Sequence, residues 1–153
     1  MIFPKTVYTS DATQTEELGK QLAEQMQSDP TIPPFIALYG DLGVGKTAFV
    51  RGFASVIAPS AIVRSPTFAL VHEYRAKPRA LFHFDMYRID SEDDLDSIGF
   101  YDYLDRGGIC LVEWSEKIPF ALPEAYLRIT IEKHEASQPN SRKITLETVE
   151  ESI

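Results

Sequence analysis

The chain has 153 residues, of which 44% are hydrophobic, and it carries a formal net charge of -8 at pH 7. The length and the apolar fraction exclude a disordered chain, and they predict one globular domain over residues 1–153. An acidic surface repels phosphate groups, which argues against stable direct binding to nucleic acid or to an anionic membrane.

Cysteine usage and the distribution of apolar residues predict a cytoplasmic protein. The single cysteine, Cys110, lies in an apolar run and cannot form an internal disulfide, which is typical of a reducing compartment. No run approaches the ~18 apolar residues needed to cross a bilayer, and the first residues lack the pattern of a signal peptide.

Between residues 10 and 57 the sequence predicts a helix, a strand and a second helix. Apolar residues recur at helical spacing in the first of these segments: Leu18, Leu22, Ala23 and Met26. Ser10 and Asp11 precede them as capping candidates, and a group of prolines beginning at Pro30 ends the helix. The apolar run at residues 35–39 is too short for a helix and predicts a buried strand. Apolar residues at helical intervals then predict a helix over residues 47–57.

The middle of the chain predicts two strands followed by short helices. Strand-like runs cover residues 68–74 and 80–86, with a proline-containing turn between them. Ser91, with Asp94 three residues later, resembles a capping box and opens a short acidic helix. A further helical turn is expected over residues 101–104.

The last part of the chain predicts a buried strand and a hairpin. Residues 109–113 form an apolar run that ends in an acid. Alternating apolar residues at 127–131 and 144–146 flank the loop signal Gln138-Pro139-Asn140 and predict an antiparallel hairpin. The predicted fold is therefore α/β with a mixed sheet, parallel around residues 35–39 and antiparallel at the C-terminal edge.

One segment matches the phosphate-binding P-loop pattern G-x-x-x-x-G-K-[ST] at every position: Gly40, Asp41, Leu42, Gly43, Val44, Gly45, Lys46 and Thr47. In such a loop the backbone N–H groups surround the phosphates, and the following helix points its positive end at them. Lys46 would bind the β- and γ-phosphates, and the Thr47 hydroxyl would bind magnesium. We therefore expect ATP and Mg²⁺ as ligands in a three-layer, P-loop NTPase-like fold. ATP is favoured over GTP because the guanine-reading Asn-Lys-x-Asp signature is absent.

Two acids at the ends of apolar runs are candidates for the remaining chemistry. Glu113 ends the uninterrupted run, which is typical of a central parallel strand, so it is the first candidate for magnesium. Asp85 ends a run interrupted by His83 and is the candidate to orient or deprotonate the attacking water. The alternative for either acid is an ordinary ion pair with Arg88 or Lys117. The chain's three histidines share no metal-ligand spacing, so they are interpreted as structural or exposed.

Trp114 follows Glu113 directly, and two interpretations of it stay open. It could stack on the base or cover the site, since α/β proteins bind ligands beyond the carboxyl ends of their strands. Alternatively, it could simply pack in the core.

Features that the sequence lacks help to distinguish between classes of nucleotide-binding protein. No lid insertion rich in arginine is visible, which disfavours the alternative of a small-molecule kinase. Neither a water-positioning glutamine nor an arginine finger in the same chain is evident, so slow hydrolysis completed by a partner is expected. A binding module that uses the nucleotide only as a switch is the third possibility.

Four blocks of residues together resemble the TsaE family, also called YjeE. They are the P-loop, Ser65-Pro66-Thr67-Phe68, His83-Phe84-Asp85-Met86-Tyr87-Arg88 and Leu111-Val112-Glu113-Trp114, and the resemblance covers about residues 39–117. It implies a bacterial ATPase that assists the TsaB–TsaD complex. That complex installs threonylcarbamoyl on the adenosine beside the anticodon of tRNAs reading codons that begin with A.

The resemblance also implies roles for single residues. Lys46 and the loop amides would hold phosphates, Thr47 and Glu113 would hold magnesium, and Asp85 would serve hydrolysis with Trp114 beside it. Ser65 and Thr67 would belong to a switch-like segment. The segment at residues 9–15, with Asp11, would lie near the base. TsaB and TsaD are the expected partners, without stable direct contact to tRNA and without a membrane.

Overall fold

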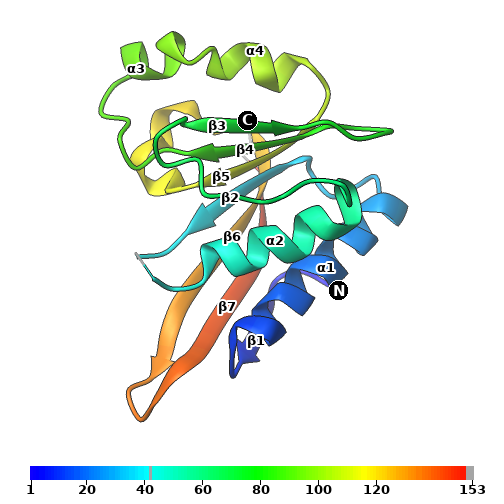
Figure 1. Ribbon diagram of the computed structural model, residues 1–153, viewed down its shortest axis with the longest axis vertical. Coiled ribbons are helices and arrows are strands. Elements are labelled where there is room, and N and C mark those ends of the chain that lie inside the picture. The colour runs from blue at the N-terminus through cyan, green and yellow to red at the C-terminus, as the bar shows by residue number, and fades with distance from the viewer. Residues whose placement is uncertain (42, 151–153) are drawn as a thin grey trace.

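The computed structural model describes residues 1–41 and 43–150 of the chain. Helices lie on both faces of one central sheet, as Figure 1 shows. The elements in chain order are β1 (Lys5–Thr9), α1 (Ala12–Ser28), β2 (Phe35–Tyr39), α2 (Lys46–Ile57), β3 (Val71–Tyr74), β4 (Leu81–Asp85), α3 (Glu92–Ser97), α4 (Phe100–Asp105), β5 (Ile109–Glu113), the 3-10 turns η1 (Ser115–Lys117) and η2 (Pro119–Ala121), β6 (Ala125–Glu135) and β7 (Gln138–Glu150).

The strands of the described residues form a seven-stranded sheet in the order β1-β7-β6-β2-β5-β4-β3. β2 runs parallel to both of its neighbours, β5 and β6, and β4 runs parallel to β5. β6 and β7 form the antiparallel hairpin, and β1 and β3 add antiparallel strands at the two edges. The mixed α/β sheet predicted from the sequence is therefore confirmed.

Each face of the sheet has its own hydrophobic core, which makes the fold three-layered. On one face, α1 and α2 cover a core that includes Phe49, Phe53 and Leu111. On the other face, α3 and α4 cover a core that includes Phe84 and Phe100. Burying apolar side chains on both faces explains the uninterrupted apolar runs of β2 and β5.

The contact between α1 and α2 is close because glycine stands at the crossing. A Cβ on Gly52 would lie 1.8 Å from the carbonyl oxygen of Glu16, and one on Gly19 would lie 2.2 Å from the carbonyl oxygen of Phe49. The two helices therefore approach at a separation that no larger residue permits at these two positions. This packing holds α2, which follows the P-loop, against the body of the protein.

The predicted caps are observed in α1 and in part in α3. The Asp11 carboxylate accepts from the backbone N–H of Gln14 at 2.9 Å, and Ser91 Oγ accepts from that of Asp94 at 3.3 Å. The Asp94 carboxylate, however, accepts from the backbone of Asp90 rather than from that of Ser91, so only half of the expected capping box forms.

Two predicted boundaries are wrong, and one strand was missed. The strand expected over residues 68–74 begins only at Val71, because Leu70 adopts a left-handed conformation with φ 69° and ends a turn there. The hairpin turns at residues 136–137 rather than at 138–140, since Gln138 already pairs with Glu135. β1 was not anticipated.

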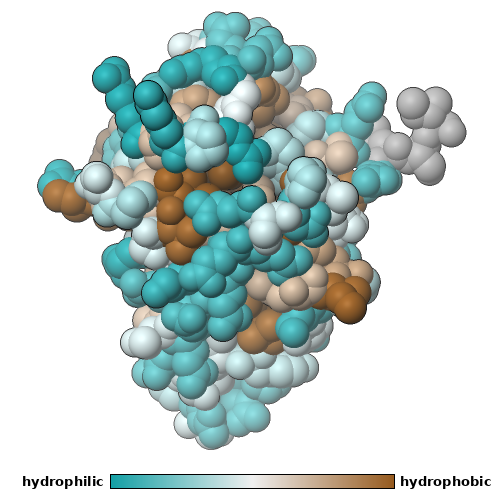
Figure 2. Space-filling view, turned by 90° about the vertical axis from the view of Figure 1, so that its right-hand side faces the viewer, coloured by the Kyte–Doolittle hydropathy of each residue, from teal (hydrophilic) through white to brown (hydrophobic). Residues whose placement is uncertain are grey.

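The surface is mostly hydrophilic on the face shown in Figure 2, where hydrophobic residues form only small, separate patches. Among the described helices, none combines the length and the hydropathy that crossing a membrane requires.

Candidate nucleotide site

The P-loop connects the carboxyl end of β2 to the first turn of α2 through glycines in left-handed conformations. Gly40, Gly43 and Gly45 have φ values of 147°, 77° and 101°, which other residues adopt only with strain. At Gly40 space is also limiting, because a Cβ there would lie 2.6 Å from the carbonyl oxygen of Ile131. The loop thus leaves the N-terminus of α2 open at its first turn, which is the geometry that a phosphate site requires. Leu42, predicted as part of this loop, lies outside the described residues.

Lys46 lies folded back over the loop. Its Nζ donates to the carbonyl oxygen of Gly40 at 2.6 Å and lies 3.8 Å from the centroid of the Trp114 ring. Burial lowers the pKa of the Lys46 ammonium, and the nearby carboxylates of Glu113, Glu116, Asp85 and Asp41 oppose that shift. A buried cation whose hydrogen-bond acceptor is a neutral carbonyl can exchange that acceptor for an anionic one.

Trp114 lies at the end of β5 with φ 59°, a rare conformation for a residue with a bulky side chain. Its ring packs against Tyr87, with ring centroids 5.0 Å apart, and against the core under α3 and α4. Its contact with Lys46 also places it at the cavity edge. Trp114 therefore packs on the core, as one interpretation expects, and it also borders the cavity, as the other interpretation requires.

One cavity of about 320 Å³ brings together residues from all of the predicted blocks: Gly43, Gly45, Lys46, Thr47, Ser65, Thr67, Asp85, Glu113 and Trp114. The order of the strands explains this convergence, since β2, β5 and β4 are adjacent and end at the same edge of the sheet. Ligands of open parallel sheets bind beyond this edge.

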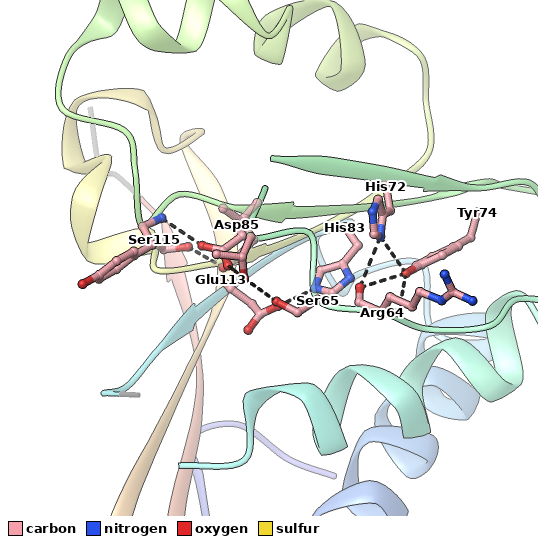
Figure 3. A network of polar contacts seen from close by, with 11 residues as sticks. Arg64, Ser65, His72, Tyr74, His83, Asp85, Glu113 and Ser115 are labelled. Atoms are coloured by element: carbon pink, nitrogen blue, oxygen red, sulfur yellow. Dashed lines mark hydrogen bonds and ion pairs between the residues drawn. The ribbon is translucent and has the colours of Figure 1, made fainter. Parts of the chain in front are cut away.

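Asp85 and Glu113 end neighbouring parallel strands and are paired in their register. Both are buried, and Figure 3 shows them side by side. Asp85 accepts at both oxygens, from the Tyr87 backbone N–H at 2.9 Å and from the Thr67 hydroxyl at 3.2 Å. Glu113 accepts at Oε2 from His83 Nε2, 2.5 Å away. Neither acid pairs with Arg88 or Lys117: Arg88 lies over the Phe68 ring, and Lys117 pairs with Asp90.

His83 is the residue whose contact the sequence did not reveal. Its side chain is completely buried, as a structural role implies, but it bonds directly to Glu113. The only sequence signal was its place two residues before Asp85, which puts both side chains on the same face of β4. His72 and His134 lie outside the cavity, in contact with Arg64 and Glu135 respectively.

The segment at residues 65–70 contacts Asp85 through its backbone and through one side chain. Figure 3 shows its first residue, Ser65, near Asp85. Ser65 and Thr67 share a hydrogen bond between their hydroxyls at 2.7 Å. Leu70 closes one helical turn by donating to the carbonyl oxygen of Pro66 at 2.6 Å, and its own carbonyl accepts from the Asp85 N–H at 3.0 Å. A displacement of this segment would therefore change the position of Asp85 or break its hydrogen bonds.

Comparison with known proteins identifies the family of this chain. Residues 9–144 match the family described as Threonylcarbamoyl adenosine biosynthesis protein TsaE. The chain belongs to the TsaE family. It is 37% identical to the tRNA threonylcarbamoyladenosine biosynthesis protein TsaE of Haemophilus influenzae, over 85% of this chain and 83% of that protein. It is 40% identical to the Bacillus subtilis protein of the same name, over 74% and 69% of the two chains.

One solved structure has the same fold. The crystal structure of Bacillus subtilis YdiB superposes with a TM-score of 0.72 at 31% identity, and the match covers 97% of this chain and 87% of that one.

In this TsaE-family chain a second, smaller cavity of about 70 Å³ adjoins the P-loop. Asp11, Ala12, Thr15, Val44, Gly45, Asn140 and Arg142 line it. Arg142 was not predicted as a site residue. From β7 it donates to the carbonyl oxygens of Val44 and Gly43, so the hairpin holds the loop by its backbone.

The donor atoms around the cavity of about 320 Å³ fit magnesium. No group of three or more His, Cys, Asp or Glu residues that could hold a metal occurs among the described residues. Magnesium does not require such a group, because it binds through one or two protein oxygens together with phosphates and water. The Thr47 hydroxyl and the Glu113 carboxylate border the same space and supply oxygens of this kind.

Proposed function

We propose that this chain is the ATP-binding and slowly hydrolysing subunit of tRNA threonylcarbamoyladenosine biosynthesis, acting with TsaB and TsaD. The family match over residues 9–144 supports the pathway. The observation that carries the ATPase proposal is the single cavity that joins the P-loop lysine and threonine to both carboxylates. A cytoplasmic location accords with work on tRNA.

The roles proposed for the residues follow from their surroundings. The loop amides and Lys46 would bind phosphates, while Thr47 and Glu113 would hold Mg²⁺, which supplies charge neutralisation at the β- and γ-phosphates when bound. Glu113 suits this role because His83 occupies one of its oxygens and no hydrogen bond to Oε1 is formed within the described residues. Asp11 and Trp114 would lie near the nucleoside, on the two sides of the loop.

Asp85 is proposed to orient the attacking water and to accept its proton. The two donors that hold its carboxylate fix its direction toward the cavity that it borders. A positioned carboxylate of this kind typically contributes 10²–10⁴-fold to a rate.

Slow hydrolysis is expected because two accelerating groups, an arginine finger and a water-positioning glutamine, are missing from the described lining of the cavity. No arginine and no glutamine is among the described residues that line it. An arginine finger is worth ~10³–10⁵ in rate where it is present. A partner would therefore supply such a group or close the switch segment around Ser65 and Thr67.

Charge accords with a role through protein partners. The acidic chain is unsuited to stable contact with tRNA, and its carboxylates suit a basic surface of TsaB–TsaD. The alternative of a small-molecule kinase has no support in the family match.

The decisive experiment is reconstituted tRNA modification with TsaB–TsaD and the other components, with and without this chain and ATP. We expect repeated rounds of modification only when both are present. Asp85→Asn should bind ATP normally and reduce phosphate release by at least ~10²-fold, whereas Asp90→Asn, an exposed acid five residues away, should behave as the unaltered chain. Multiple rounds of modification by Asp85→Asn without hydrolysis would instead show that ATP acts only as a binding switch.

A further inference from the structure

The two carboxylates at the ends of β4 and β5 are held in different ways. Asp85 and Glu113 are directly opposite each other, an arrangement that destabilises a sheet when both side chains are charged. Asp85 is constrained by donors at both oxygens. Glu113 has a longer side chain, with one more rotatable bond, and among the described residues its carboxylate has a single donor, His83.

Among the described residues, Glu113 is the only hydrogen-bond partner of the His83 side chain. It lies on β4, opposite Leu111 of β5, with 0% of its surface exposed. Because a carboxylate only accepts, Nε2 carries the proton that is donated to Glu113. Nδ1 is buried and has no hydrogen-bond partner within the described residues. A buried polar ring that leaves one nitrogen unpaired costs stability, so a role at Glu113 accounts for a histidine at this place in an otherwise apolar strand interior.

We propose that His83 is a positioning residue for the metal site: it holds Glu113 Oε2 so that Oε1 faces the cavity as a magnesium ligand. The inference rests on the proposed binding of Mg²⁺–ATP. Its physical basis is that a glutamate fixed in advance does not lose rotamer freedom when the ion binds. Groups that orient a metal ligand in this way typically contribute 10–100-fold to metal affinity.

Two substitutions of His83 separate this role from a packing role. The side-chain amide nitrogen of His83→Gln can occupy the place of imidazole Nε2 and still donate to Glu113. The shorter His83→Asn places its amide near Nδ1, so the contact is lost while a polar group remains. His134→Asn, on the β6 surface away from the cavity, serves as the matched control.

The measurement is the affinity for Mn²⁺, followed by electron paramagnetic resonance, of protein saturated with a non-hydrolysable ATP analogue. We expect the dissociation constant for Mn²⁺ to rise 10–100-fold in His83→Asn and to stay within about threefold of the unaltered value in His83→Gln and His134→Asn. Binding of the analogue in excess EDTA, measured by calorimetry, should be the same in all four proteins. Equal Mn²⁺ affinity in His83→Asn and the unaltered chain would overturn the proposal.

A second measurement needs no substitution. In ¹⁵N nuclear magnetic resonance of the unaltered, nucleotide-free chain, the His83 ring should carry its proton on Nε2. A proton on Nδ1 alone would overturn the proposal even if His83→Asn failed to fold. Failure of the proposed function looks different: the unaltered protein would then bind Mn²⁺ no more tightly than the free analogue does.

Discussion

Arg142 donates from Nε to the carbonyl oxygen of Val44 across 2.8 Å, although 98 residues separate the two in the chain. The same guanidinium reaches Gly43, Pro139 and Ser141 through its other nitrogens. The end of the β6–β7 hairpin and the P-loop are therefore fastened to each other by one side chain. Since the bonds go to carbonyl oxygens, they leave the loop amides free to face phosphate.

Replacing this arginine should weaken nucleotide binding. We expect Arg142→Met to raise the Kd for ATP by about tenfold, because hydrogen bonds to a charged donor are worth roughly 1.5–3 kcal/mol each and the loop loses its support. Calorimetric titration checks this. Arg51→Met is the control, since the one polar contact of Arg51 within the described residues is an exposed ion pair with Glu16 at 4.0 Å. An equal loss of affinity in both variants would contradict the prediction.

Lys46→Met should abolish productive ATP binding without harming the fold. The lysine is buried at a cost that its lowered pKa reports, so an apolar side chain of similar length should leave the free energy of unfolding equal or higher. Urea unfolding without nucleotide measures this. The pH dependence of the free energy of unfolding gives a second test. The unfolded chain holds the Lys46 proton more tightly than the folded one, so this group adds stability as pH rises toward 10.5. The variant should lack that contribution.

Trp114 emission should report nucleotide binding. The Lys46 ammonium lies over the indole, and bound phosphates would draw it away. We expect a saturable change in fluorescence on addition of Mg²⁺–ATP and none in Trp114→Phe. A flat titration, with binding confirmed by calorimetry, would show that the lysine stays on the ring.

Gly52→Ala should destabilise the protein by about 3 kcal/mol, because the added methyl would overlap the Glu16 carbonyl and force the two helices apart. This outweighs the ~1 kcal/mol that alanine gains over glycine in a helix. Urea unfolding gives the comparison. Ser55→Ala, on the exposed side of α2, should change stability by no more than ~0.5 kcal/mol.

Burial raises the pKa of the Cys110 thiol to about 12, from 9.0 in an exposed position. The folded protein should therefore resist a thiol reagent at pH 8 and react fully in denaturant. Between pH 9 and 12 the unfolded chain releases this proton while the folded one keeps it, so stability falls as pH rises. Cys110→Ala should show a smaller fall; rapid labelling of the folded chain would contradict the assignment.

Features set by local chemistry were predictable from the sequence. The P-loop, α2 and the acid-terminated strand beside β2 each follow from spacing within a short window, and their order along the chain brings them to one sheet edge. β1 escaped notice because its five residues are mostly exposed and carry little apolar pattern.

Features set by the register of distant strands were not predictable. The bond between His83 and Glu113 depends on how β4 aligns with β5, and the contact of Arg142 with the loop depends on the length of the hairpin. The turn was misplaced because Pro139 and Asn140 favour turns locally. In the structure they belong to β7, in an irregularity of the register between the pairs Glu135–Gln138 and Lys133–Arg142. Tertiary pairing decided against local preference there.

The bond between Arg142 and Gly43 spans 99 residues, which has a consequence for biosynthesis. A ribosome adding about 5–20 residues per second exposes the glycine-rich loop several seconds before it makes the arginine that braces it. A nascent chain should thus contain the complete P-loop sequence before it can bind a triphosphate. Competence for nucleotide would be gained only as the last strands of the sheet emerge.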